Sequence, residues 1–245
     1  MASKFMPPQL TVGGEPEPIK MIGLSVEVRV AGMLAELTWT MTFKNPHARQ
    51  LETELEFSMP DGAVVFGYGI EMNGTIVDAV PVEKETARIA FEEAVRSGRD
   101  AGLVEQAKGN VFKTRVYPVP ASSTKRVKVS YELQLDSPSL VIPLASAVPL
   151  DNFDLRVEIA ESRFAPVLRD DAGLAGIGFK RSADVNVIGG SFHGVILSKP
   201  LVIGLPALEP EAIAKSEPEV LVSTDPTFQD EIFFMVNDFV KVPDS

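Results

Sequence analysis

The side chains that could catalyse a reaction or bind a metal are few in this sequence of 245 residues. Its two histidines, His47 and His193, are far apart in sequence, and no recognisable motif surrounds either one. A catalytic dyad or a metal site would need the two imidazoles close together, with an orienting carboxylate. His47 follows Asn45-Pro46 in a predicted turn, and His193 lies in a predicted strand. We therefore expect both histidines to have packing or solvent-facing roles.

Other motifs of catalysis or cofactor binding are missing from the sequence. No serine lies in a G-x-S-x-G elbow, and no phosphate-binding glycine pattern follows a strand and opens a helix. Gly67-Tyr68-Gly69 lies inside a predicted strand, where glycine marks a bulge or a close backbone approach. Asp170-Asp171 and Asp225 lack the loop spacing of a calcium site. Because there is no cysteine, thiol nucleophiles, disulfides and zinc–thiolate sites are excluded. The sequence predicts no catalytic, cofactor-binding or metal-binding residue.

Carboxylates are the remaining groups that could do chemistry. Glu52, Glu54 and Glu56 alternate along one predicted strand, so their side chains share one face, which is typical of a solvated outer sheet face. An alternative function is a hydrolase that uses carboxylates in a cleft between two β units, with two acids of separated pKa values. Acids that converge in such a cleft would favour the hydrolase, and apolar side chains that fill it would favour an interaction module.

Composition and charge narrow the class of protein. A hydrophobic fraction of 45% is that of an ordinary globular protein. The formal charge of −11 argues against a nucleic-acid partner, which would need a basic patch. Residues 1–20 lack an apolar run long enough for a secretory signal, and residues 139–150 are too short and too rich in proline to span a bilayer. With a native start at Met1, we expect a cytoplasmic protein without membrane insertion.

Alternation of apolar and polar residues predicts strands along most of the chain. The clearest case is Ala35–Phe43, in which Leu37, Trp39 and Met41 share one face and threonines share the other. Asn73-Gly74 is a strong hairpin signal. The predicted strands comprise residues 21–30, 35–43, 51–59, 63–72, 75–80, 111–117, 127–135, 153–159, 184–188, 192–197, 220–223 and 231–236.

One convincing helix interrupts this β pattern, between Pro81 and Gly98. Its apolar stripe consists of Ala87, Ala90, Phe91, Ala94 and Val95. A short helix gains most of its stability from tertiary packing, so we expect the stripe to dock on a sheet. Its exposed charged face is the candidate partner-binding surface, which consists of Arg88, Glu92 and Arg96, with Arg99 just beyond the end of the helix.

These patterns predict a mainly β protein: an antiparallel β-sandwich with one packed α-helix, followed by a second antiparallel β unit. We divide the chain into a flexible N-terminal segment (1–20), the β-sandwich (21–136), the second β unit (137–236) and a C-terminal linker (237–245).

The first unit resembles a known family, the vault protein inter-α-trypsin (VIT) domains. Their E-x-x-F-x-(F/M)-P-x-x-A-x-V stretch is matched by Phe57-Ser58-Met59-Pro60-Asp61-Gly62-Ala63-Val64-Val65. The match continues in order through Val82-Glu83-Lys84, residues 101–106 and Asn110-Val111-Phe112, and covers roughly residues 21–135. The resemblance implies a β-sandwich module that is used for protein–protein interaction and not for catalysis.

VIT domains commonly precede a von Willebrand factor A domain, whose Asp-x-Ser-x-Ser loop holds a metal. The sequence has no such loop, because Asp136-Ser137-Pro138-Ser139 has the wrong spacing. The resemblance therefore implies a scaffold that forms the N-terminal part of a longer protein, with an adjacent A domain or another protein as its partner. The expected absence of a secretory signal makes it more similar to the intracellular members of the family.

The helix stripe gives a first testable prediction. Phe91→Ala should lower the free energy of unfolding by about 3–5 kcal/mol if the ring packs in the core. Glu92→Ala is the matched control and should cost only about 0.2–0.5 kcal/mol, since exposed helix pairs contribute little. Denaturant unfolding of both variants checks this, and a Phe91→Ala loss below about 1 kcal/mol would show that the helix is peripheral.

Overall fold

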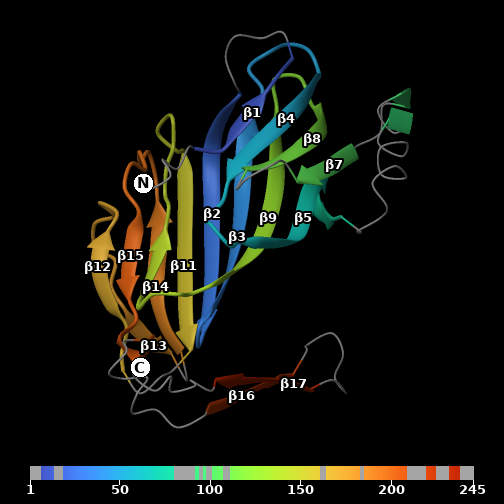
Figure 1. The fold of residues 1–245 in the computed structure, drawn as a ribbon. Coiled ribbons are helices and arrows are strands. Elements are labelled where there is room, and N and C mark those ends of the chain that lie inside the picture. The colour runs from blue at the N-terminus through green and yellow to red at the C-terminus, as the bar shows by residue number, and fades with distance from the viewer. Residues whose placement is uncertain are drawn as a thin grey trace.

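One large mixed β-sheet forms the centre of the structure. The structure is a computed structural model, and it describes residues 7–13, 19–79, 92–93, 96–97, 101–106, 111–160, 164–182, 185–208, 219–224 and 232–237. The sheet has eight strands in the order β13-β14-β11-β2-β3-β9-β5-β6 (Figure 1). Its strands are β2 (Lys20–Ala31), β3 (Leu34–Lys44), β5 (Val64–Met72), β6 (Thr75–Asp78), β9 (Thr124–Gln134), β11 (Asn152–Ala160), β13 (Lys180–Ser182) and β14 (Val185–Phe192). The predicted mainly β class is confirmed.

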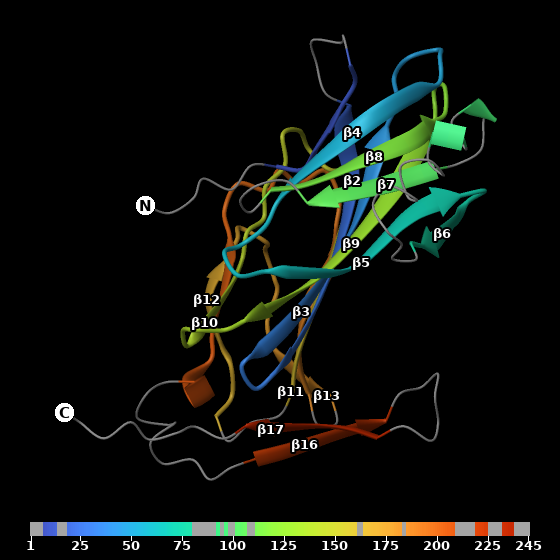
Figure 2. The same cartoon turned by 45° about the vertical axis from the view of Figure 1, so that its right-hand side comes forward.

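Three smaller sheets complete the described part of the chain (Figure 2). The four-stranded sheet consists of β1 (Gln9–Thr11), β4 (Leu51–Ser58), β8 (Val111–Val119) and β7 (Ala101–Gln106), in that order. The three-stranded sheet consists of β10 (Ser139–Ile142), β15 (Leu201–Gly204) and β12 (Val167–Asp171). A short turn of 3-10 helix, η1 (Pro206–Leu208), follows β15, and β16 (Glu219–Thr224) pairs with β17 (Ile232–Asn237) in a two-stranded sheet.

The large sheet has one apolar face, and the strand alternation seen in the sequence creates it. In register across the sheet, Val26 lies opposite both Trp39 and Leu155, and Trp39 lies opposite Val129. All four side chains are buried, and so are the inward residues of the four-stranded and three-stranded sheets, in one continuous core. The predicted face of Ala35–Phe43 is therefore confirmed as core.

Aromatic rings join the large sheet to the four-stranded sheet. Trp39 on β3 and Phe57 on β4 are both fully buried, and their ring centroids lie 5.5 Å apart in an edge-to-face arrangement. Phe57 also lies 6.2 Å from the ring of Tyr131 on β9. Such pairs are favourable beyond the area that they bury, so these rings fix the relative position of the two sheets.

A parallel ladder joins the two halves of the chain, which antiparallel patterning alone did not predict. Strand β11 pairs with β2 in parallel, with eight residue pairs from Asn152 opposite Gly23 to Ile159 opposite Val30. On its other side β11 pairs with β14 in the usual antiparallel way. The two predicted β units therefore share one continuous sheet, although each is antiparallel within itself.

Buried Asn45 anchors the loop between β3 and β4. Its side-chain amide donates to the carbonyl oxygens of Arg49 (2.9 Å), Val119 (3.1 Å) and Pro120 (2.9 Å), and its Oδ1 accepts from the backbone N–H of His47 (2.9 Å). A buried polar side chain is stable only when its hydrogen bonds are satisfied. Asn45 therefore holds the loop against the end of β8.

Several local expectations differ from the structure. Gln9–Thr11, placed in the flexible segment 1–20, form β1 against β4 because Leu10 is fully buried. In place of the predicted strands 184–188 and 192–197, the structure has one strand, β14, which runs through Gly189-Gly190, where the sequence suggested a break. His193 accordingly lies just after that strand and not within one. A bulge does lie between Val65 and Gly67, as predicted. Side chains, and not a neighbouring backbone, pack against these glycines, since an added Cβ would lie 3.0 Å from the Ser130 Cβ at Gly67 and 2.8 Å from the Ile76 Cγ2 at Gly69.

The packed helix falls mostly outside the described residues. Glu92, Glu93 and Arg96 are helical, and the Ser97 N–H donates to the carbonyl oxygen of Glu93 at 3.0 Å. The stripe of Ala87, Ala90, Phe91, Ala94 and Val95 lies outside the described residues. Its docking on a sheet stays a prediction.

Gly189 allows β14 to approach β11 closely, and this gives a second prediction. A Cβ at this position would lie 2.0 Å from the backbone oxygen of Leu155, so alanine would force the two strands apart. Gly189→Ala should therefore lower the free energy of unfolding by about 1–3 kcal/mol or more. Gly178→Ala, where an added Cβ meets nothing within 4 Å, is the matched control and should change stability by less than about 0.5 kcal/mol. Equal losses in denaturant unfolding would contradict this account of Gly189.

Buried tyrosines predict a loss of stability in alkali. Burial raises the pKa of Tyr68 to about 12, against a smaller lowering by the Thr114 hydroxyl, and burial likewise raises the pKa of Tyr131. The unfolded chain releases the Tyr68 proton near the ordinary tyrosine pKa of 10.0, before the folded chain does, so stability falls as pH rises from about 10 to about 12. The loss should reach about 2–3 kcal/mol for Tyr68.

Denaturant unfolding of the wild type and of Tyr68→Phe over this pH range measures that contribution. We expect the free energy of unfolding of the wild type to fall relative to that of Tyr68→Phe as pH rises, because phenylalanine has no proton to release. Curves that stay parallel would show that the Tyr68 hydroxyl is not shielded from water.

Candidate functional site

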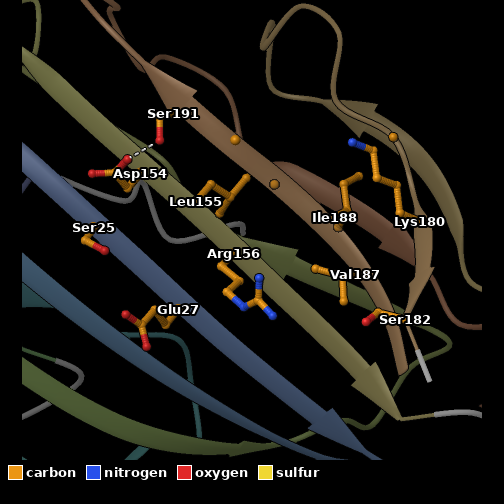
Figure 3. Close-up of a pocket in the computed structure, with 13 residues that line it drawn as sticks. Ser25, Glu27, Asp154, Leu155, Arg156, Lys180, Ser182, Val187, Ile188 and Ser191 are labelled. Atoms are coloured by element: carbon orange, nitrogen blue, oxygen red, sulfur yellow. Dashed lines mark hydrogen bonds between the residues drawn. The ribbon is translucent and has the colours of Figure 1, made fainter. Parts of the chain in front are cut away.

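A polar hollow lies where the two halves of the chain meet on the large sheet. It has a volume of about 570 Å³ and lies over β2, β11, β14 and β13 (Figure 3). Its charged lining residues are Glu27 on β2, Asp154 and Arg156 on β11, and Lys180 on β13. The hollow is also lined by Ser25 on β2, Ser191 on β14 and Ser182 on β13 (Figure 3).

Strand register brings these side chains together. Asp154 lies opposite Ser25 of β2 and Ser191 of β14, and Arg156 lies opposite Glu27 and Gly189. Residues two apart on a strand point to the same face, so these rows share the face opposite the apolar core. The hollow therefore exists because β2 and β11 pair in parallel in this register.

A network of charge pairs holds the side chains beside the hollow. Arg156 donates from Nε and Nη2 to Glu158 Oε1 at 2.8 and 2.5 Å, and Arg29 Nε lies 3.7 Å from Glu158 Oε2. Ser191 Oγ donates to Asp154 Oδ1 at 2.5 Å. Glu158 thus links Arg29 of the first unit to Arg156 of the second. Because these pairs are largely exposed, each contributes little to stability.

The hollow does bring carboxylates of the two units together, which was the condition set for the hydrolase alternative. Glu27 belongs to the first unit and Asp154 to the second, and both line it. Both side chains are exposed to solvent, however, whereas a catalytic carboxylate pair needs a sheltered environment that gives its two acids different pKa values. Exposed, paired charges of both signs are better suited to polar contacts with another macromolecule.

The structure describes part of the predicted partner-binding face. Arg96 Nη2 lies 3.7 Å from Glu92 Oε2, in the predicted i,i+4 pair, with the Arg96 side chain 80% exposed and that of Glu92 40% exposed. Arg88 and Arg99 lie outside the described residues. The role of this face in binding stays a prediction.

The other candidates occupy separate places in the fold. His47 lies in the loop after Asn45, whereas the Nδ1 of exposed His193 lies 3.1 Å from the backbone oxygen of Asp151. In the described part of the chain, no three histidines or acids gather in a group that could hold a metal ion. Asp170 and Asp171 accept hydrogen bonds from the backbone of the turn that follows them.

The glutamates of β4 share the outer face of the four-stranded sheet with a lysine. Lys113 on β8 binds Glu56 and lies 3.3 Å from Glu54 Oε1. The hydrogen bond to Glu56 raises the pKa of Lys113, and Glu54 raises it further. A cation from the neighbouring strand therefore balances the carboxylates that the sequence placed on one face.

Sequence reasoning missed the residues of the hollow. The alternation of β2 and β11 does place Glu27, Asp154 and Arg156 on outward faces, but only the pairing of strands separated by more than a hundred residues makes them neighbours.

Among the residues that the structure describes, no helix is long and apolar enough to cross a membrane.

Comparison with known proteins shows which protein family the first half of the chain matches. A family model, the Vault protein inter-alpha-trypsin domain, matches residues 21–131. Protein mono-ADP-ribosyltransferase PARP4 of Mus musculus is 28% identical over 133 residues, which cover 54% of this chain and 7% of that protein. Von Willebrand factor A domain-containing protein 5A of Homo sapiens is 28% identical over 128 residues, which cover 51% of this chain and 16% of that protein. The match therefore spans a small part of each relative.

Among solved structures, an M1 zinc metallopeptidase from Deinococcus radiodurans covers 89% of this chain and 46% of its own, with 10% identity and a TM-score of 0.44. A likeness this weak says nothing about catalysis in this chain. The family model, in contrast, begins at the start of β2 and ends within β9, and it includes the stretch at Phe57–Val65 on which the sequence resemblance rests. Residues 21–131 of this chain belong to the VIT domain family.

Proposed function

We propose that this chain is a non-catalytic scaffold module that binds proteins and supports a neighbouring von Willebrand factor A domain in a longer protein. The observation that carries the proposal is the VIT match over residues 21–131, and a relative that is 28% identical over 128 residues is named for its von Willebrand factor A domain. The match covers only 16% of that relative, so the activity of the whole relative is not transferred to this chain.

The architecture supports a scaffold role. A single core lies between the large sheet and its two covering sheets, and the inward residues of both halves contribute to it. Such a core resists relative movement of the halves, because close-packed interiors deform little. The outer faces of the large sheet and of the four-stranded sheet carry charges of both signs, which suit specific but reversible contacts with other proteins.

A cytoplasmic location stays a prediction from the sequence. The hydrolase alternative has one supporting feature, which is that Glu27 and Asp154 line the same hollow. We rank it second because both acids are exposed.

Two measurements on the purified chain test the proposal. In the first, the chain is used as bait, and each captured protein is purified and tested for direct binding by calorimetry. We expect at least one purified protein, an A domain or another, to bind with a Kd in the micromolar range or below, as expected of transient interaction modules. Failure of every purified protein to bind would contradict the proposal.

In the second measurement, wild type, Glu27→Gln and Asp154→Asn are assayed with ester, peptide, glycoside and phosphoester substrates. We expect no turnover by any of the three proteins. Wild-type hydrolysis that drops about a hundredfold or more in either variant would favour the hydrolase, because loss of a general acid or base has an effect of that size.

A further inference from the structure

The edge of the large sheet at β5 is only partly covered. Strand β9 pairs with Val64–Ile70 of β5, but β6 on the other side pairs only with Gly69–Met72 (Figure 2). One more hydrogen bond, from the Ala79 N–H to the Tyr68 carbonyl oxygen (2.8 Å), extends this side of the ladder. In the part of the chain that the structure describes, no strand pairs with Val64–Gly67 on that side, and we call this segment the free edge.

Two large apolar side chains stand on this free edge. Val64 is 56% exposed and Phe66 is 57% exposed, and a bulge lies between Val65 and Gly67. Soluble proteins usually protect free edges with charged residues or proline, because an apolar edge invites another strand. An isolated exposed apolar residue needs no explanation, but two of them on an unpaired edge suit a binding partner.

Two carboxylates without a salt bridge lie beside this edge. Val64 is opposite Glu132 on β9, and Glu132 is directly opposite Glu36 on β3, so all three share the polar face of the sheet. Like charges directly opposite each other are destabilising. In the part of the chain that the structure describes, neither Glu36 nor Glu132 has a cation within salt-bridge distance, and Arg29, opposite Glu36, lies 3.7 Å from Glu158.

The acids further along the same edge are paired. Glu71 Oε1 accepts from Arg126 Nη2 at 3.0 Å, and Asp78 Oδ1 lies 2.5 Å from Lys128 Nζ. In the described part of the chain, exposed apolar side chains, backbone groups without a neighbouring strand and carboxylates without a salt bridge thus occur together where β6 does not cover β5.

We propose that the free edge Val64–Gly67 binds an extended basic segment of a partner protein, which adds to the large sheet as a strand beside β5. This inference deepens the proposed function and rests on it. Backbone hydrogen bonds to β5 supply affinity, and an apolar side chain of the segment packs on Phe66. A lysine or arginine of the segment lays its aliphatic stem over Val64 and brings its charge toward Glu132, while Glu36 on the next strand adds a longer-range attraction.

A second copy of this chain is a poor occupant of the edge. The chain carries a formal charge of −11, and a copy that paired through its own β5 would bring another Glu132 and Glu36 beside two carboxylates that form no salt bridge with any described residue. Because neither Glu36 nor Glu132 has a salt bridge among the described residues, charge complementarity favours a foreign, basic strand.

Peptide titration of the full isotope-labelled chain, followed by nuclear magnetic resonance, tests the inference. The probe is a short peptide in which lysine alternates with valine, and its matched control has glutamate in place of lysine. We expect the lysine peptide to shift the amide signals of Val64–Tyr68, to bind at least about tenfold more tightly than the glutamate peptide, and to weaken with added salt. Equal binding of both peptides, or shifts at other edges only, would overturn the inference.

Matched variants sharpen the test. Phe66→Ser should weaken binding of the lysine peptide about tenfold or more, whereas Ile196→Ser, which replaces a side chain that is 61% exposed elsewhere, should leave it unchanged. The double variant Glu36→Gln, Glu132→Gln should abolish the preference for lysine over glutamate. Equal binding of the lysine peptide by Phe66→Ser and Ile196→Ser would show that the peptide binds elsewhere. A wild-type dimer in sedimentation that Phe66→Ser dissociates would show that a second copy of the chain, and not a basic segment, occupies the edge.

The outcomes also separate this inference from the proposed function. If a purified partner binds Phe66→Ser as tightly as wild type, the inference is wrong and the proposed function stands. If no purified protein binds the wild-type chain, the proposed function is wrong whatever the peptides do.

Discussion

The apolar face of the eight-stranded sheet is the constraint on which the rest of the structure depends. Every strand from β14 to β5 turns alternate side chains toward it, and that face must be shielded from water. No single short sheet in the described part of this chain is wide enough to do so. The four-stranded sheet covers one half and the three-stranded sheet the other, and both contribute to the same core. The opposite face carries the exposed charges, the hollow and the carboxylates of Glu36 and Glu132 beside β5.

The hollow and the free edge both lie on the large sheet, and both halves of the chain contribute to the core beneath it. The hollow depends on the pairing of β2 with β11, and the free edge depends on the shortness of β6 relative to β5. The described residues of both surfaces lie mainly on strands. A partner would therefore meet preformed geometry, which reduces the entropy that binding costs.

Much of the fold could be predicted from the sequence, since period-two alternation identifies strands such as β3 and the Asn73-Gly74 turn identifies the hairpin of β5 and β6. The inward role of Trp39 followed from the same pattern and is confirmed. Alternation reveals which residues share a face but not which strand lies beside which. The parallel ladder between β2 and β11 was therefore beyond reach, and with it the meeting of Glu27 and Asp154. Short strands such as β1 were missed because three residues are too few to show a period.

The β2–β11 ladder has a mechanical consequence. Its strands run side by side in the same direction over eight residue pairs, so a force along the strand axes loads all their hydrogen bonds together in shear. Bonds loaded in this way must break cooperatively, whereas a hairpin pulled open from its end loses them one after another. Sliding β2 past β11 along their axes therefore requires more force than opening a hairpin of the same length from its end.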